Sequence, residues 1–99
     1  MTIIQEYILN FCHQLDIYLP LGSQILSVCE LHDRILMIIM CDYKEAKYKH
    51  REIMMFNSNQ EIDSSVTAYI GSVIRDYPDG TTKVWHVFEK ENFSSESGS

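Results

Sequence analysis

The sequence feature that most constrains the fold is a pair of β-rich runs that flank a Pro-Asp-Gly turn, within the stretch from Tyr69 to Glu89. Pro78 presets φ for the first central position of a type I turn, and Gly80 can adopt the positive φ that closes such a turn with a bulge. In the second run, Trp85 and His86 point to opposite faces because successive side chains of a strand alternate. Both faces carry large apolar groups, which is typical of a strand inside a sandwich or barrel, or of one covered by a partner chain.

Similar short runs recur along the rest of the chain, with turn signals about every 8 to 15 residues. Besides the hairpin, the sequence predicts strands over residues 3–11, 15–19, 24–31, 34–42 and 52–56. The first of these also fits a helical spacing, and we prefer the strand. The run from Ile35 to Cys41 has no polar alternation, so we expect a central strand covered on both faces. We therefore predict an all-β fold with minor α content: a small antiparallel β-sandwich or partly open barrel of six or seven strands.

Two internal segments and the C-terminus carry weaker signals. Residues 42–51 switch abruptly to polar and charged side chains, which predicts a loop or a widened hairpin tip. Residues 60–68 are interpreted as a loop with one turn of helix, because Asp63-Ser64-Ser65 has the composition of a helix cap. We expect a single β-rich domain over residues 1–91 and a disordered tail over residues 92–99, where Ser, Gly and Glu dominate.

The charge balance bears on the partners. With 14 acidic and 8 basic side chains the formal net charge is −6, so duplex nucleic acid is a poor partner, because its phosphates bind Lys and Arg. The longest apolar run is far shorter than the roughly 20 residues that span a bilayer, so we expect no membrane contact. The N-terminal residues lack the basic and apolar regions of a secretory signal, which predicts a cytosolic protein. Cys12, Cys29 and Cys41 are widely spaced in apolar contexts and are expected to be small buried thiols.

A basic cluster in this acidic chain is the first candidate site. Tyr43, Lys47, Tyr48, Lys49 and Arg51 interleave aromatic rings with cations, a pattern that can grip a phosphate and stack on a base. The same residues also suit the solvated tip of a hairpin. Both interpretations stay open on the sequence alone.

Trp85 and His86 form the second candidate site. A histidine between two apolar neighbours of one strand face is most often a buried group that donates a structural hydrogen bond. The alternative is a polar anchor in a ligand pocket floored by Trp85 or Phe88. No spacing among the histidines and cysteines matches a metal motif, and we expect no metal, no cofactor and no catalytic residues.

Three motifs carry a resemblance to a known group of proteins. The run Leu19 to Val28 is similar to a Pro-x-Gly-Ala-x-Ile-Leu-x-Val pattern, Tyr69 to Ser72 to Tyr-Ile-Gly-Thr, and Trp85 to Glu89 to a terminal aromatic-His-Val-Phe-Glu. Together these motifs make the chain resemble a family of small tailed-phage proteins of unknown function, over most of residues 3–89. The basic residues Lys44 to Arg51 depart from the family pattern. The resemblance implies a phage origin, a single β-rich domain and no known enzyme activity.

From these observations we expect a non-enzymatic phage accessory protein that acts by binding in the host cytoplasm. Its expected role is to antagonise a host defence or regulatory factor, either by sequestering a small nucleotide signal or by occluding a host protein. The alternatives are a small nucleotide-degrading enzyme and a purely structural or interaction β domain. Unpaired sheet edges and strands that are apolar on both faces also predict a homodimer, with Trp85 or Phe88 of each chain against the other.

Overall fold

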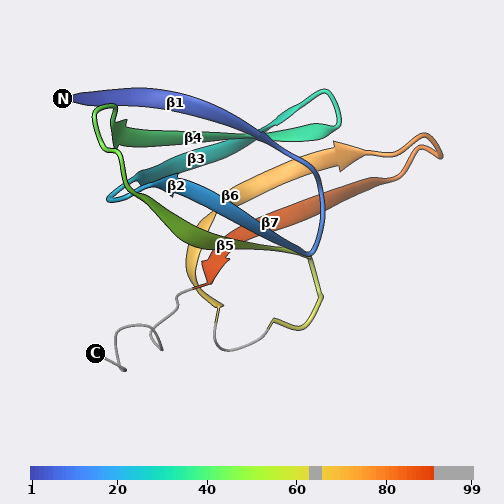
Figure 1. Cartoon of the computed structure of the whole chain (residues 1–99). Coiled ribbons are helices and arrows are strands. Elements are labelled where there is room, and N and C mark those ends of the chain that lie inside the picture. Colours follow the sequence, from blue (N-terminus) through green and yellow to red (C-terminus); the bar gives the residue numbers. More distant parts are fainter. Residues whose placement is uncertain (63–65, 91–99) are drawn as a thin grey trace.

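The chain folds into two antiparallel β-sheets packed face to face (Figure 1). The computed structural model describes residues 1–62 and 66–90, with no account of the side chains of residues 66 and 67. The seven strands are β1 (Thr2–Leu9), β2 (Gln14–Pro20), β3 (Gln24–Leu31), β4 (Arg34–Asp42), β5 (Tyr48–Asn57), β6 (Val66–Asp76) and β7 (Thr82–Lys90). The predicted small antiparallel β-sandwich is thereby confirmed, and the described residues contain no helix, hence none that could cross a bilayer. The tail over residues 92–99 lies outside the described residues.

The strand order separates the chain into a three-stranded sheet, β1-β4-β3, and a four-stranded sheet, β2-β5-β7-β6. Neighbouring strands of each sheet run antiparallel. Both predicted hairpins are present, as β3–β4 and as β6–β7. The first turns through His32 and Asp33, which both have positive φ, and the second places Gly80 at φ +88° as its Pro-Asp-Gly sequence predicts.

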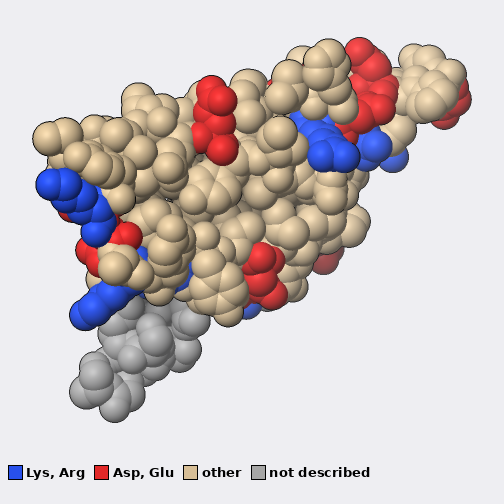
Figure 2. All heavy atoms as spheres, turned by 45° about the horizontal axis from the view of Figure 1, so that its top comes forward, with Lys and Arg blue, Asp and Glu red and all other residues tan. Residues whose placement is uncertain are grey.

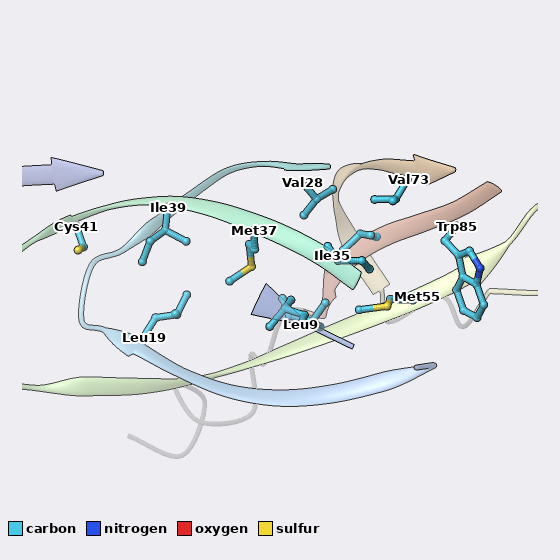
Figure 3. Packing of buried hydrophobic residues seen from close by; sticks show 12 residues of the cluster. Leu9, Leu19, Val28, Ile35, Met37, Ile39, Cys41, Met55, Val73 and Trp85 are labelled. Carbon is cyan, nitrogen blue, oxygen red and sulfur yellow. The ribbon is translucent and has the colours of Figure 1, made fainter. Parts of the chain in front are cut away.

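The core fills the space between the two sheets (Figure 3). Along β4, Ile35, Met37 and Ile39 are fully buried and alternate with residues that are only half-buried. This is the alternation expected of a strand with one face toward a core. From the four-stranded sheet the core receives residues such as Ile53 and Val87, which are fully buried. Together these side chains form a single apolar cluster.

Gly71 marks a close approach between the sheets, where β6 of one packs against β3 of the other. A Cβ at position 71 would lie 3.2 Å from Cγ2 of Val28. That contact is tighter than ordinary packing, so the Val28 side chain would have to shift by a few tenths of an ångström to admit a Cβ. The glycine of the Tyr-Ile-Gly-Ser motif is therefore explained by packing.

The structure corrects the predicted loop over residues 42–51. Asp42 ends β4 and Tyr48 already begins β5, so the connection consists of residues 43–47 only. Lys49 and Arg51 pair with β2 as regular strand residues. The backbone of β2 needs a partner along its length, and this requirement outweighs the polar composition of the segment.

The predicted helical turn over residues 60–68 is also wrong where it can be checked. Val66 to Ala68 belong to β6, and residues 60–62 have no regular structure. The supposed cap, residues 63–65, lies outside the described residues. Register shifts between Val66 and Ala68, and again between Tyr69 and Gly71, adapt β6 to the edge of β7. The hydrogen bonds offered by that edge decide the conformation rather than the weak helical spacing.

Two burial predictions fail on the three-stranded sheet. β4 is central in its sheet, but within one chain only its inner face is covered, and Ile38 on the outer face is half-buried. Cys29 is exposed, whereas Cys41 is buried and Cys12 is half-buried. Cys29 pairs with Leu36, so it belongs to the same outer face. The apolar composition of that face, which suggested burial, instead leaves an exposed apolar surface.

Candidate ligand-binding site

His86 lies on the outer face of the four-stranded sheet, in β7, and is hydrogen-bonded on both sides of its ring. Its Nε2 is 3.0 Å from Oγ of Ser58, and its Nδ1 is 3.3 Å from the hydroxyl oxygen of Tyr69. A neutral imidazole donates from one nitrogen and accepts at the other, and each hydroxyl can take either role. The two hydroxyls therefore fix the ring orientation while leaving its tautomer free to change.

Aromatic rings extend this polar group along the sheet. The Tyr69 ring packs edge-on against Phe88, with centroids 5.1 Å apart, and Phe88 in turn packs against Phe56 at 5.9 Å. The centroids of Tyr69 and His86 are 6.1 Å apart. Cross-strand pairing of β6, β7 and β5 produces this row, because Tyr69 pairs with Phe88 and His86 with Phe56. The exposed ring of Tyr69 gives the row an accessible aromatic surface.

A hollow of about 370 Å³ adjoins Ser58, where β7 extends beyond the last residue of β5. β5 reaches only to Asn57, which pairs with Trp85, whereas β7 extends back to Thr82. Residues 82–84 pair with β6 alone among the described strands. The hollow is lined by Asn57, Ser58, Thr82, Lys83 and Val84. Its volume is within the range of small-molecule sites, which begins at about 300 Å³.

The lining of the hollow offers mainly hydrogen-bond donors. The amide nitrogen of Asn57 is buried and has no hydrogen-bond partner among the described residues. Lys83 adds an ammonium group, whose Nζ lies 5.6 Å from the centre of the Tyr77 ring. Thr82 is already engaged, because its hydroxyl donates to Asp76 at 2.9 Å. Because the Asn57 amide nitrogen is buried, Lys83 is the donor by which the hollow can bind an acceptor-rich group.

The basic segment lies at the other end of β5. Tyr43 and Lys47 belong to the connection between the sheets, and Tyr48 and Lys49 begin β5. Tyr48 lies eight residues before Phe56, the residue of β5 that pairs with His86, which is about 26 Å along the strand. The structure therefore does not bring these four residues together with His86.

Asp42 holds the connection that carries the basic segment. Its carboxylate accepts a hydrogen bond from the Lys44 amide at 3.0 Å and another from the N-terminal ammonium group at 3.2 Å. The Lys44 hydrogen bond and the N-terminal group lower the pKa of Asp42. Further along β1, burial raises the pKa of Tyr7, and the charges of Tyr48 and Cys41 act in the same direction. The two hydrogen bonds of Asp42 therefore give the start of the connection over residues 43–47 a structural role.

Arg51 differs from the other basic residues because it points into the sandwich. Its guanidinium binds both carboxylate oxygens of Glu89 on β7, and Nη1 donates to the Ser23 carbonyl at 2.9 Å. Both side chains of the ion pair are largely buried. Arg51 therefore links β5 and β7 to the turn before β3, and all three of its guanidinium nitrogens already donate a hydrogen bond.

Trp85 is part of the core. It is 8% exposed, and its ring lies 5.5 Å from Phe11 and 5.7 Å from His13 between centroids. Its indole nitrogen donates to the Tyr77 hydroxyl at 3.2 Å. Figure 3 shows it at one end of the buried cluster. Trp85 thus lies on the inner face of the four-stranded sheet, whereas His86 lies on its outer face.

The residues of the hollow were not among those predicted to form a site. Asn57 and Ser58 look like ordinary turn residues, and Lys83 is an isolated charge beside the Pro-Asp-Gly turn. Tyr69, which contacts His86 rather than the hollow, lies in the Tyr-Ile-Gly-Ser motif but was not predicted to belong to a site either. The proximity of Asn57, Ser58 and Lys83 depends on β5 stopping short of β7, which is a property of strand register.

Comparison with protein families gives one match over nearly the whole chain. The profile of a domain of unknown function, DUF7352, covers residues 1–98. The chain belongs to this family. In comparisons of this DUF7352 chain with curated proteins and with solved structures, nothing matched.

Proposed function

We propose that this DUF7352 chain is a non-enzymatic binding protein that sequesters a small nucleotide. The observation that supports this most directly is the hollow at the end of β5, where Lys83 supplies a cation and Ser58 connects the hollow to the hydrogen-bonded His86 and Tyr69. A nucleotide combines an acceptor-rich phosphate with a planar base. The two halves of the site offer a matching chemistry for each.

The separation within the site suits such a ligand. Lys83 precedes His86 by three residues on β7, or about 10 Å along the strand, so the two side chains leave opposite faces and Lys83 reaches the hollow at the edge of β7 that β5 leaves open. A phosphate placed against Lys83 at this edge leaves the base of the same nucleotide to lie over Ser58 and His86 on the outer face, beside the Tyr69 ring. Stacking of a base on an aromatic side chain contributes roughly 1–3 kcal/mol and tolerates different bases. Ser58 joins the two halves, because it lines the hollow and contacts His86.

The biological setting belongs to the same proposal. The three motifs that resemble tailed-phage proteins support a phage origin and action in the host cytoplasm. There, removal of a nucleotide signal would antagonise a host defence or regulatory factor. A net charge of −6 is compatible with this role, because a local cation can hold a small anion without the extended basic surface that duplex nucleic acid requires.

Two other functions have some support in the geometry. The exposed side chains of Tyr69 and Ile74 protrude from the same outer face and suit the occlusion of a host protein. The 3.0 Å contact between Ser58 and His86 is the geometry of a nucleophile beside a base, so a nucleotide-degrading enzyme is the other candidate.

Calorimetric titration and mass spectrometry separate these functions. We would titrate the full chain with cyclic di-AMP, cyclic di-GMP and ADP-ribose, heat the complex, and analyse the released nucleotide. Saturable binding followed by recovery of the intact nucleotide is the expected result. Recovery of cleavage products that depends on Ser58 would establish an enzyme instead, and no binding of any nucleotide probe would leave protein occlusion as the better hypothesis.

Matched lysine variants locate the site. Lys83→Gln removes the cation of the hollow, and Lys49→Gln makes the same change at the far end of β5. For a nucleotide that binds, we expect Lys83→Gln to weaken affinity roughly tenfold, because a charge-assisted hydrogen bond contributes about 1.5–3 kcal/mol. Lys49→Gln is expected to leave affinity within about twofold. The reverse order would transfer the site to the basic segment.

A further inference from the structure

Arg75, near the end of β6, is held by aromatic rings rather than by hydrogen bonds. Its guanidinium carbon, Cζ, lies 4.6 Å from the centre of the Phe11 ring and 5.0 Å from the centre of the Tyr77 ring. Both rings are anchored to Trp85 of the core, because Phe11 packs 5.5 Å from the Trp85 ring and the Tyr77 hydroxyl accepts the indole N–H at 3.2 Å. Rings from the β1–β2 connection and from the β6–β7 hairpin thus fix the position of one cation.

This arrangement leaves the hydrogen-bond donors of Arg75 free. An aromatic ring attracts a cation through its π face and does not use the in-plane N–H groups. Within residues 1–62 and 66–90, Nε is buried without a hydrogen-bond partner, and Oδ1 of Asp33 approaches it only to 3.9 Å, which is too far for a hydrogen bond. The side chain is nonetheless 29% exposed, and its two terminal nitrogens are not buried. An arginine with a fixed position and free donors is suited to hold an oxyanion with two parallel bonds.

A second cation stands directly beside Arg75. Lys83 of β7 is the cross-strand partner of Arg75, so both side chains leave the same face of the hairpin. Nζ of Lys83 also lies against the Tyr77 ring, 5.6 Å from its centre. Like charges that pair directly across two strands repel each other, and the carboxylates that approach them, those of Asp33 and Asp79, are on exposed hairpin tips. A bound anion would offset this repulsion.

The two cations lie where the β6–β7 hairpin extends past the rest of the four-stranded sheet. There, residues 82–84 pair with β6 alone among the described strands. The tip of the β3–β4 hairpin, which carries Asp33, is at the same end of the sandwich (Figure 1). Figure 2 shows basic and acidic side chains next to one another at this end. Because Lys83 also lines the hollow beside Ser58, the free donors of Arg75 extend the proposed nucleotide site.

We propose that Arg75 binds a second phosphate of the nucleotide whose first phosphate lies at Lys83. This inference rests on the proposed function and names its ligand class, which is nucleotides with two directly joined phosphates, such as ADP or ADP-ribose. Cross-strand neighbours are about 5 Å apart at Cβ, so the two cations suit two adjacent phosphates. In a cyclic dinucleotide the phosphates are separated by ribose groups, so this pair of cations would meet only one of them.

Calorimetric titration of the full chain with AMP and ADP tests the ligand class, because the two nucleotides differ by one phosphate. ADP is expected to bind about tenfold or more tightly than AMP, since a guanidinium can hold a phosphate with two charge-assisted bonds. Arg75→Gln is expected to weaken ADP binding about tenfold and to leave AMP affinity within about twofold. Arg34→Gln is the matched control, because Arg34 is an exposed arginine next to Asp33, and it should preserve the preference for ADP.

Asp33→Asn tests the role of Arg75 without altering its packing. Removing the Asp33 carboxylate removes a negative charge that competes with a phosphate at Arg75, so ADP affinity should rise about two- to fivefold at low salt. AMP affinity should change less, because its phosphate lies at Lys83. If Arg75 serves only to pack against Phe11 and Tyr77, this gain is absent, and its absence would overturn the inference.

The outcomes also separate this inference from the proposed function. Circular dichroism establishes that each variant is folded. Equal affinities of the wild-type chain for AMP and ADP, or an equal loss of both in folded Arg75→Gln, would overturn the role of Arg75 and leave nucleotide binding intact. No affinity for AMP, ADP or ADP-ribose would overturn both.

Discussion

The two outer faces of the sandwich are built by the same rule and carry opposite chemistry. The three-stranded sheet presents aliphatic side chains such as Ile4 and Ile8, whereas the four-stranded sheet presents His86 with its hydroxyl and aromatic neighbours. In both sheets, residues that point into the core alternate with residues that point outward, and both sheets contribute aliphatic side chains to the core. The difference therefore lies entirely in the residues that the core does not constrain.

This contrast teaches where to look for function in a small sandwich. The inner residues all serve one purpose, because they must fill a single core from which water is excluded. Outer residues are free to differ, so a cluster of them with a common chemistry indicates a contact that the isolated chain does not show. The aliphatic face is therefore the place to test for a protein partner, and the polar aromatic face the place to test for a ligand with hydrogen-bonding groups.

The largest effect is expected from Trp85→Ala, which tests whether one core supports both faces. The indole is buried against Phe11 and His13, so its loss should reduce the free energy of unfolding by roughly 3–5 kcal/mol. Urea denaturation followed by circular dichroism measures the change. Nucleotide binding should be lost together with the β-sheet signal as the chain unfolds, and two separate unfolding transitions would show that the two sheets are stabilised separately.

Arg51→Ala comes next and tests the polar link between the sheets. Removing the guanidinium leaves Glu89 largely buried without its partner and frees the Ser23 carbonyl, so we expect a loss of about 2 kcal/mol. Lys47→Ala combined with Lys49→Ala is the control, because exposed positions usually cost within about 0.5 kcal/mol each. Equal losses in the two proteins, measured by urea denaturation, would contradict the assigned role of Arg51.

His86→Ala sharpens the description of the polar face. It removes the contacts to Ser58 and Tyr69, and a partly exposed hydrogen bond contributes about 0.5–1.5 kcal/mol. We expect a loss of about 1 kcal/mol in stability with no change in the state of association. Thermal unfolding and sedimentation equilibrium provide the two measurements. A change in the measured mass would mean that His86 also takes part in an interface between copies of the chain.

The smallest effect concerns the turn that joins β6 and β7. Asp79 accepts hydrogen bonds from the Thr81 hydroxyl at 2.6 Å and from the Thr81 amide at 2.9 Å, and these lower the pKa of Asp79 below its ordinary value of 3.8. A lowered pKa favours the carboxylate in the folded state, so the stabilisation is present above the ordinary pKa and is lost as the pH falls through the folded value.

The Thr81 amide resonance reports this change. Its chemical shift should titrate with a midpoint below 3.8, and Asp79→Asn should abolish the titration. A midpoint at or above the ordinary value would mean that the turn does not hold the carboxylate in solution. Both faces should be unaffected, because the turn lies at the tip of the β6–β7 hairpin (Figure 1).

The sequence predicts what is decided within a few neighbouring residues. The Pro-Asp-Gly turn and the tight β3–β4 connection were recognisable because turn geometry depends on local φ preferences. The alternation of Trp85 and His86 was recognisable for the same reason. Because successive side chains of one strand alternate, Trp85 lies in the core and His86 on the surface.

Sequence reasoning fails where the outcome depends on distant strands. The charged start of β5 becomes a strand because β2 pairs with it, and this pairing is not encoded in the segment itself. The hollow exists because β5 and β7 end at different positions, and no local pattern reports that offset. The exposure of Cys29 depends equally on which side of the sheet is left uncovered. Of the candidate site, the sequence therefore predicted only His86 and not the residues of the hollow.

The strand order also fixes the time course by which the chain can fold. β3 with β4, and β6 with β7, are hairpins that close locally, but Thr2 of β1 pairs with Asp42 and Gln14 of β2 with Met54, each 40 positions away. Closing such long loops costs entropy before any contact is gained, and β-sandwiches of this kind fold in milliseconds to seconds. During synthesis β1 and β2 must wait, unpaired, until β4 and β5 have been made. For that interval the aliphatic residues of β1 are exposed to solvent, and such transient exposure favours aggregation.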